Sequence, residues 1–145
     1  MSGGVGKSTL TVNLGFHLAQ TGKKVLLVDM DPQASLTTFL GFNPFDIEST
    51  IYKGLLSKEL HPLNADSVEC DLIPSNIYLA QAELKLASEL KREYRLANAL
   101  SKGSEHYDVV LIDCPPSLGL LSINCLVAAD YLLIPIQTEY KSVEA

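Results

Sequence analysis

Hydrophobic residues along this chain come in short continuous runs that alternate with stretches of helical periodicity. Three runs rich in valine, isoleucine and leucine predict strands at residues 25–29, 108–113 and 131–136, and a weaker run, VECDLIP, predicts a fourth. Polar residues do not alternate with the apolar ones inside these runs. We therefore expect strands that are covered on both faces, as in a parallel sheet.

Helical periodicity fills the segments between the predicted strands. Residues 7–21 carry leucines at four-residue intervals and are followed by a glycine, and further helical regions are predicted at about 76–102 and at 117–127. Residues 41–59, interrupted by an Asn-Pro pair, predict a connection with one short helix. Strand and helix alternate, so the sequence predicts an α/β fold with a doubly wound, mostly parallel sheet that binds ligands at the carboxyl ends of its strands.

The composition of the chain excludes only a few classes of protein. With 145 residues, 47% of them hydrophobic, the chain can bury one ordinary core, and we expect a single domain over residues 1–145. A net charge of −6 gives no general attraction to nucleic acid or to an anionic membrane. The three cysteines form no Cys-x-x-Cys pair, which favours reduced thiols. Without a long apolar run or a signal peptide, we expect a cytoplasmic protein with no stable membrane insertion.

The segment GGVGKST, where the helix of residues 7–21 begins, is typical of a phosphate-binding loop. Its glycines let backbone N–H groups turn toward phosphate oxygens, and the helix adds the positive end of its dipole. Lys7 supplies a full charge to the β- and γ-phosphates, and the Ser8 hydroxyl can bind Mg²⁺. The alternative is a glycine-rich turn that only caps the helix. The residues predicted to bind the nucleotide are Gly3, Gly4, Val5, Gly6, Lys7, Ser8 and Thr9.

Two of the predicted strands end in carboxylates. Asp29 and Asp31 lie at and just beyond the end of one strand, where Asp31 could orient an attacking water or contact the metal shell. Asp113 ends another strand and is well placed to hold a Mg²⁺-bound water. A single aspartate at a strand end is usually a turn or cap residue. Three of them beside a phosphate-binding loop favour a site for phosphate chemistry.

Four segments resemble the deviant Walker A, A′ and B segments of the ParA/MinD family of partitioning and positioning ATPases, closest to its ParA side: GGVGKST, VLLVDMDPQAS, DVVLIDCPPSLGLLSINCL and LLIPIQTEY. The resemblance implies a P-loop NTPase fold with ATP and Mg²⁺ as cofactors. It makes Lys7, Asp31 and Asp29 the expected catalytic residues, with Asp31 positioning the hydrolytic water and Asp29 supporting that site. Ser8, Asp31 and Asp113 become the expected metal site.

The same resemblance implies a dimer switch. ATP joins two identical subunits, the dimer holds a surface such as the nucleoid, and an adaptor protein that stimulates hydrolysis releases it. The expected function is ATP hydrolysis that partitions or positions DNA or carboxysomes over the nucleoid, with non-specific DNA contacts outside this stretch. Three alternatives stay open: a MinD-like membrane-cycling ATPase, a P-loop kinase or ligase acting on a small metabolite, and a module that binds ATP without turnover.

The sequence departs from the family pattern in three places. Family members carry a strand before the loop and continue well beyond the last segment, so we expect a domain that is incomplete at both ends, with the N-terminal strand and the C-terminal part missing. The signature lysine of the family falls on position 2, where this chain has Ser2. Serine at this place resembles the McdA branch, which distributes carboxysomes over the nucleoid with an adaptor protein.

Overall fold

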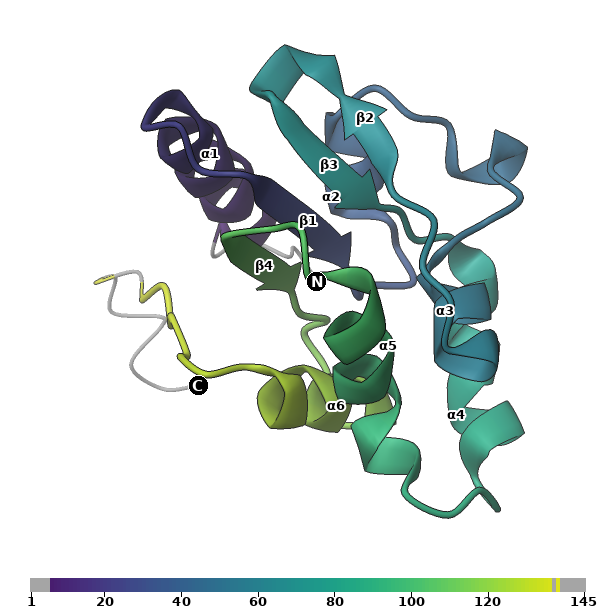
Figure 1. The fold of residues 1–145 in the computed structure, drawn as a ribbon. Coiled ribbons are helices and arrows are strands. Elements are labelled where there is room, and N and C mark those ends of the chain that lie inside the picture. The colour runs from purple at the N-terminus through teal and green to yellow at the C-terminus, as the bar shows by residue number, and fades with distance from the viewer. Residues whose placement is uncertain (1–5, 137, 139–145) are drawn as a thin grey trace.

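The computed structural model describes residues 6–136 and 138, and it shows a four-stranded sheet with helices on both faces (Figure 1). The strands are β1 (Val25–Asp29), β2 (Leu63–Ala65), β3 (Cys70–Ile73) and β4 (Val109–Asp113), in the spatial order β2-β3-β1-β4. β1 pairs in parallel with β3 and β4, and β2 pairs antiparallel to β3. The prediction of an α/β fold with a doubly wound, mostly parallel sheet is confirmed.

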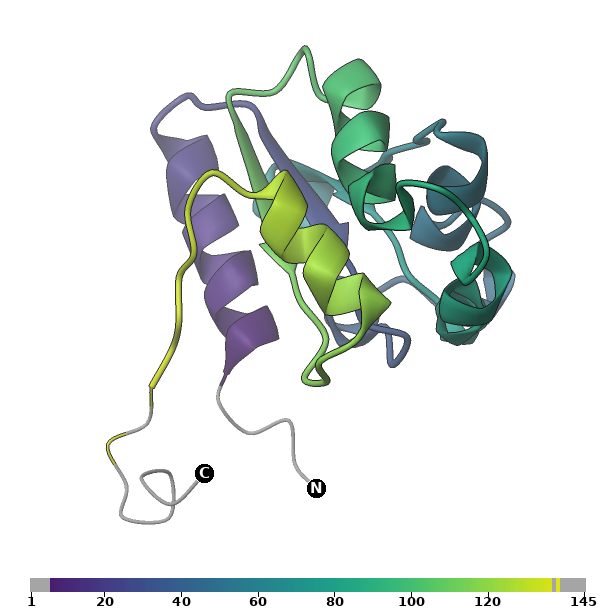
Figure 2. The same ribbon diagram turned by 90° about the horizontal axis from the view of Figure 1, so that it is seen from below.

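Six helices and four short 3₁₀ turns surround the sheet. The helices are α1 (Lys7–Gln20), α2 (Ser35–Phe39), α3 (Ile51–Ser57), α4 (Ala82–Leu86), α5 (Arg95–Gly103) and α6 (Leu120–Ala128) in the described part of the chain. The 3₁₀ turns are η1 (Pro44–Asp46), η2 (Asp66–Val68), η3 (Ile77–Gln81) and η4 (Arg92–Tyr94). Figure 2 shows α1 on one side of the strands and α5 and α6 on the other.

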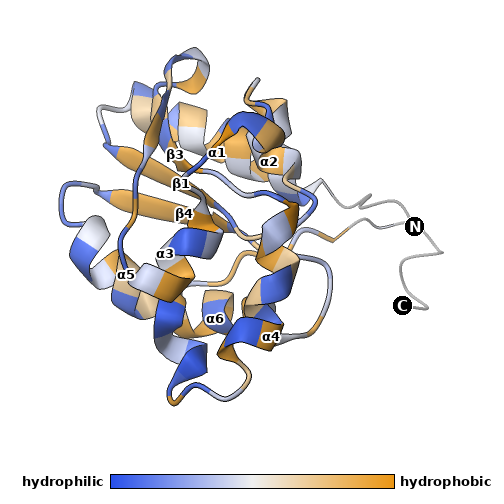
Figure 3. Cartoon of the chain, turned by 90° about the vertical axis from the view of Figure 1, so that its right-hand side faces the viewer, coloured by the Kyte–Doolittle hydropathy of each residue, from blue (hydrophilic) through white to orange (hydrophobic). Residues whose placement is uncertain are grey.

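The central strand β1 is buried on both of its faces. Leu26 and Val28 belong to a hydrophobic cluster built with α3, α4, α5 and α6, whereas Val25 and Leu27 belong to a second cluster built with α1 and α2. Successive side chains of a strand point to opposite faces, so a continuous hydrophobic run is what a strand between two helical layers requires. Figure 3 shows β1, β3 and β4 in hydrophobic colours, while the helices mix hydrophobic and hydrophilic residues.

Helix α1 lies very close to the sheet at Gly15. A Cβ atom built on this residue would lie 2.8 Å from Leu27 Cδ2 and 3.4 Å from Cys70 Sγ. Only glycine fits there without a shift of the neighbouring side chains. This close packing fixes α1, whose first turn carries the predicted phosphate-binding residues, against β1 and β3.

The predicted strand at 131–136 is wrong in this structure. These residues form neither helix nor strand, and their hydrophobic side chains are exposed, from 60% at Leu132 to 93% at Tyr131. A strand needs a neighbour for its backbone N–H and C=O groups. In the described part of the chain β4 pairs with β1 alone, and the segment after α6 runs away from β4 (Figure 2). Composition predicted the tendency of these residues to form a strand but not the partner that a strand requires.

The helical region predicted at 76–102 is divided in the structure. η3 and α4 come first, and α5 begins only at Arg95. Between them Lys91 has a positive φ of 55°, which no helix can contain, and Leu90 is exposed. The continuous helix predicted for this region is therefore broken near its centre. The third predicted helix is confirmed as α6, although it begins at Leu120 instead of residue 117.

Candidate nucleotide site

The parallel strands β1 and β4 bring the predicted aspartates to one edge of the sheet. β1 ends at Asp29 and β4 ends at Asp113, and these two residues are paired in the strand register. Asp31 follows β1 by two residues, after Met30, whose N–H donates to the carbonyl oxygen of Asp113 at 2.9 Å. Neighbouring parallel strands thus place carboxylates from distant parts of the sequence side by side, as the sequence predicts.

Ser8, in the first turn of α1, contacts Asp113 directly. Its Oγ donates a hydrogen bond to Asp113 Oδ2 at 2.5 Å. Burial raises the pKa of Asp113 above its ordinary value, while the bond from Ser8 and the charge of Lys7 lower it and the charge of Asp31 raises it. All four residues therefore lie within electrostatic range of one another.

The chemistry of this cluster fits magnesium. Mg²⁺ binds through hard oxygen donors and usually takes one or two protein ligands together with substrate phosphates and water. The Ser8 hydroxyl and the Asp113 carboxylate are such donors, and they already lie in contact. Within residues 6–136 and 138, no group of three His, Cys, Asp or Glu side chains could hold a metal ion by itself. A magnesium ion at this edge would complete its shell with phosphate oxygens and water.

Gly6 precedes α1 in the left-handed conformation, with φ 72° and ψ 24°. Glycine adopts this conformation without steric cost, and the Gly6 carbonyl accepts a hydrogen bond from the Leu10 N–H at 2.8 Å. The turn from loop to helix predicted by the glycine-rich sequence is thus present at its last glycine. Thr9 is exposed on the first turn of α1. The remaining predicted loop residues lie outside the described part of the chain: Gly3, Gly4 and Val5.

Asp29 is fully buried, and both of its carboxylate oxygens accept hydrogen bonds. Oδ1 accepts from the Asp31 N–H at 3.1 Å, and Oδ2 accepts from the N–H and the hydroxyl of Thr37 at 2.9 and 2.7 Å. Burial raises the pKa of Asp29 to about 6, although these hydrogen bonds oppose the rise. The contacts favour a supporting role for Asp29, and its part in catalysis stays a prediction.

Ser75, which follows β3, closes a ring of hydrogen bonds around Asp31. Its N–H donates to Thr37 Oγ1 at 3.0 Å, and its hydroxyl donates to the carbonyl oxygen of Asp31 at 2.7 Å. We call Asp29, Asp31, Thr37 and Ser75 the Asp31 ring. Thr37 and Ser75 were not predicted from the sequence, because a small polar residue becomes conspicuous only when its burial and its hydrogen-bond partners are known.

The turn after Asp31 is held from within as well. Asp31 is half-buried, and its Oδ1 accepts a hydrogen bond from the Gln33 N–H at 2.9 Å. The Asp31 carbonyl oxygen also accepts from the Ala34 N–H at 2.9 Å. Ala34 has a φ of 54°, a left-handed conformation that costs an alanine about 1–2 kcal/mol. The surrounding contacts therefore hold this turn in a conformation that its sequence alone does not favour.

A pair of cysteines lies next to Asp113. The Cys125 thiol of α6 lies beside Cys114, and their interaction lowers the pKa of Cys114 and raises that of Cys125. Cys70 is buried in the other cluster, where burial raises its pKa to about 11. All three thiols are free. The three histidines of the chain are exposed and lie outside the nucleotide site.

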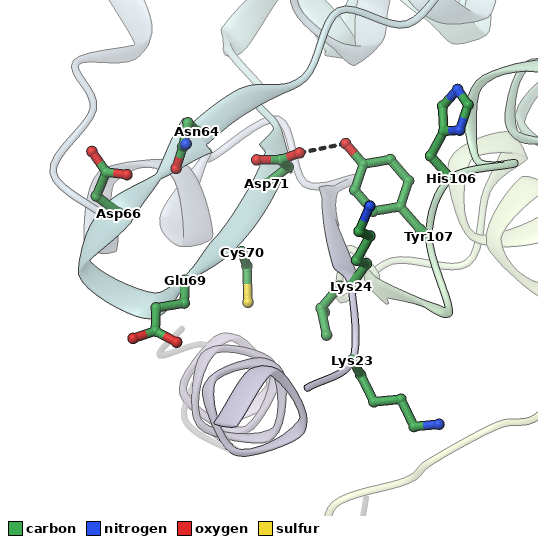
Figure 4. Close-up of a pocket in the computed structure, with 10 residues that line it drawn as sticks. Lys23, Lys24, Asn64, Asp66, Glu69, Cys70, Asp71, His106 and Tyr107 are labelled. Carbon is green, nitrogen blue, oxygen red and sulfur yellow. Dashed lines mark hydrogen bonds between the residues drawn. The ribbon is translucent and has the colours of Figure 1, made fainter. Parts of the chain in front are cut away.

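A polar hollow of about 480 Å³ lies at the opposite end of the sheet, where the parallel strands begin (Figure 4). Its wall includes Lys23, Lys24 and His106, and across from them Asp71, whose Oδ2 accepts a hydrogen bond from the Tyr107 hydroxyl at 2.5 Å. Charges of both signs line the hollow, so it selects no ligand by charge. It is separated from the nucleotide site by the length of the strands.

None of the described helices is both long enough and apolar enough to cross a lipid bilayer.

Comparisons with known proteins agree with this geometry. A family model described as an AAA domain matches residues 1–145. The sporulation initiation inhibitor protein Soj of Bacillus subtilis (strain 168) is 48% identical over 145 residues, with 98% of this chain and 57% of Soj covered. The chromosome partitioning protein ParA of Myxococcus xanthus (strain DK1622) is 44% identical over 147 residues, with 98% of this chain and 51% of that protein covered. The chain thus spans little more than half the length of these relatives.

Solved structures show the same fold. Cobyrinic acid a,c-diamide synthase from Mycobacterium smegmatis, with bound ATP analogue and magnesium, superposes with a TM-score of 0.87 at 42% identity, over 95% of this chain and 57% of that one. The apo McdA of Cyanothece superposes with a TM-score of 0.84 at 34% identity, over 99% of this chain and 57% of that one.

Proposed function

Because this chain belongs to the ParA/MinD family of P-loop ATPases, we propose that the full protein binds Mg-ATP and hydrolyses it to ADP and phosphate. The observation that carries the proposal is the contact between the Ser8 hydroxyl and Asp113, at the start of the helix that begins with Lys7. The magnesium complexes of the M. smegmatis protein with an ATP analogue and with ADP support the choice of ligand.

Each residue of the site has a proposed task. The phosphates would lie at the amino end of α1, where the N–H groups of the first turn, the helix dipole and Lys7 attract anions. Ser8 and Asp113 would hold Mg²⁺, which would offset the negative charge of the phosphates. Asp31, at the same edge of the sheet, positions the attacking water and contacts the metal shell, and Asp29 holds Asp31 in place.

In the cell, we infer, this hydrolysis partitions or positions cargo. The name of the M. xanthus relative, a chromosome partitioning protein, supports a role in chromosome partitioning, and its 44% identity favours DNA over carboxysomes, since McdA is 34% identical. The proposed working state is an ATP-dependent homodimer in the cytoplasm. It associates with the nucleoid through DNA contacts outside this stretch, and an adaptor protein stimulates it. Ser2, where the family resemblance predicts lysine, lies outside the described residues.

A second candidate is an ATP-dependent ligase acting on a small metabolite. The name of the M. smegmatis neighbour, a diamide synthase, favours this class, and its structure is 42% identical to this chain. A ligase would release phosphate only in proportion to a modified acceptor, whereas a partition ATPase releases phosphate with no acceptor present. Phosphate release from ATP and buffer alone therefore separates the two candidates.

Two substitutions in the full chain test the proposal. Lys7→Ala should weaken Mg-ATP binding by about 2 kcal/mol, roughly 30-fold, because it removes a charge-assisted hydrogen bond to phosphate. Asp31→Ala should keep ATP binding and slow phosphate release about 100-fold. Lys23→Ala, which removes an exposed lysine at the far end of the sheet, is the matched control and should match the parent in both assays. Unchanged ATP affinity in Lys7→Ala would refute the phosphate assignment, and unchanged hydrolysis in Asp31→Ala would refute the role of Asp31.

A further inference from the structure

We propose that Thr37 and Ser75 are positioning residues for Asp31, and that the hydrogen-bond ring they complete sets the rate at which bound ATP is hydrolysed. The inference rests on the proposed function, since it concerns the residue that we expect to orient the attacking water. Neither Thr37 nor Ser75 belongs to the phosphate-binding loop or to the three aspartates predicted from the sequence.

The ring holds the main chain of Asp31 on both sides. The Asp31 N–H donates to Asp29 Oδ1 at 3.1 Å, and the Asp31 carbonyl oxygen accepts from the Ser75 hydroxyl at 2.7 Å. Fixing these two groups fixes the backbone angles of Asp31 and hence the direction of its Cα–Cβ bond. With Oδ1 also bonded to the Gln33 N–H at 2.9 Å, the carboxylate is aimed before any ligand arrives. Such preorganisation is how a supporting shell contributes to a reaction rate.

Thr37 is the link that only a hydroxyl-bearing residue can provide. Its Oγ1 donates to Asp29 Oδ2 at 2.7 Å and at the same time accepts from the Ser75 N–H at 3.0 Å. A valine has the same shape but can do neither, so it would break the link to Ser75 and leave the backbone N–H of residue 37 as its one bond to Asp29 Oδ2. A serine keeps both bonds. Comparing Thr37→Val with Thr37→Ser therefore separates the effect of the hydrogen bonds of residue 37 from the effect of its side-chain volume.

Because the ring is buried, the loss of one of its hydrogen bonds can leave a polar group without a partner. Asp29, Thr37 and Ser75 are all completely buried, so water cannot replace a missing partner at these positions. The ring also joins three segments of the chain: the end of β1, helix α2 and the residues that follow β3. The N–H groups of Gln33 and Ala34 already donate hydrogen bonds to Asp31, and these bonds within the turn are what folding the turn requires. The bonds of the ring come in addition to them.

The experiment compares ATP binding with single-turnover hydrolysis in the full chain. Thr37→Val and Ser75→Ala should slow hydrolysis about 10-fold or more, because misplacing a reacting group by a fraction of an ångström costs about that much, while the Kd for Mg-ATP stays within about 2-fold. Thr37→Ser should restore the rate to within about 3-fold of the parent. The matched control is Ser104→Ala at the end of α5, which removes a similar bond, from the Ser104 hydroxyl to the carbonyl oxygen of Leu100 at 2.6 Å. It should leave the rate unchanged.

An Asp31→Ala background provides the decisive readout. If Thr37 and Ser75 act through the Asp31 carboxylate, then Thr37→Val and Ser75→Ala should slow hydrolysis no further once that carboxylate is gone. The same loss in both backgrounds, or a rate within about 3-fold of the parent in both single variants, would overturn the inference. If Thr37→Val does not fold, Ser75→Ala decides, since it removes one hydroxyl and keeps the N–H bond to Thr37. Hydrolysis that does not depend on Asp31 would instead refute the role proposed for Asp31, whereas a full chain that hydrolyses no ATP would refute the proposed function.

Discussion

Replacing Gly15 by alanine tests how closely α1 packs on the sheet. The added Cβ would lie 2.8 Å from Leu27 Cδ2, and Leu27 is completely buried, so its methyl group cannot swing into solvent. Alanine gains about 1 kcal/mol over glycine in a helix interior, whereas overpacking a filled core costs about 1–3 kcal/mol. Since Cys70 Sγ at 3.4 Å blocks another direction of relief, the cost should exceed the gain. We expect Gly15→Ala to lower the free energy of unfolding by about 1 kcal/mol and Gly15→Val to lower it by about 3 kcal/mol.

Urea denaturation followed by circular dichroism measures this effect. The midpoint should fall while the m-value stays constant, which shows that the native state changed and not the surface exposed on unfolding. Asn13→Ala, on the exposed side of α1, is the control, because it changes helix propensity without touching the sheet, and it should alter stability by no more than about 0.5 kcal/mol. A Gly15→Ala protein that is about 1 kcal/mol more stable than the parent would refute the reasoning, since only helix propensity would then have changed.

Three further predictions concern the site. Ser8→Ala should abolish the part of ATP affinity that depends on Mg²⁺, measured by binding with Mg²⁺ and with EDTA, and an equal magnesium effect in both proteins would contradict the metal assignment. The nucleotide-free protein should become less stable as the pH rises from 4 to 6, because the pKa of about 6 that Asp29 has when folded lies above its unfolded value, so that the folded state binds the proton more tightly. By chemical denaturation this contribution of Asp29 should amount to about 2 kcal/mol between pH 4 and pH 6, and it should be absent in Asp29→Asn. Cys114 should react with iodoacetamide before Cys70 and Cys125, whose pKa values are raised, and peptide mass spectrometry would show any other order.

Much of the fold follows from the hydrophobic pattern because the central strand has a simple requirement. A strand between two helical layers must be apolar at every position, and the run that becomes β1 meets that requirement. Asp29 and Asp113 were predictable for the same reason: a carboxylate at the end of such a run marks the edge where the sheet meets solvent and ligand. The glycine before Lys7 likewise predicts the turn into α1.

The features that were predicted wrongly or missed share a physical cause. Each of them depends on contacts with residues distant in sequence. Residues 131–136 have the composition of a strand, yet they lie beside no strand in the described structure. The break at Lys91 comes just before residues that bond to α6, where Asn124 accepts from the Leu96 N–H and donates to the Arg92 carbonyl oxygen. Thr37 and Ser75 are ordinary polar residues in the sequence, and they gain a role only because α2 and the end of β3 meet beside Asp31.

Because β1 is buried on both faces, it should also exchange its amide hydrogens more slowly than the strand at the edge of the sheet. A strand that is hydrogen-bonded on both edges and covered on both faces can expose its amides only when its neighbours separate, so Leu26, Leu27 and Val28 should exchange their amide hydrogens last, at the rate of global unfolding. β2 is three residues long and pairs only with β3 in the described chain, so its amides should exchange through much smaller openings. Asp29 directly follows the residues whose amide hydrogens should exchange most slowly. Any rearrangement that accompanies an ATP cycle would then move loops and helices around a strand end that stays still for the lifetime of the folded state.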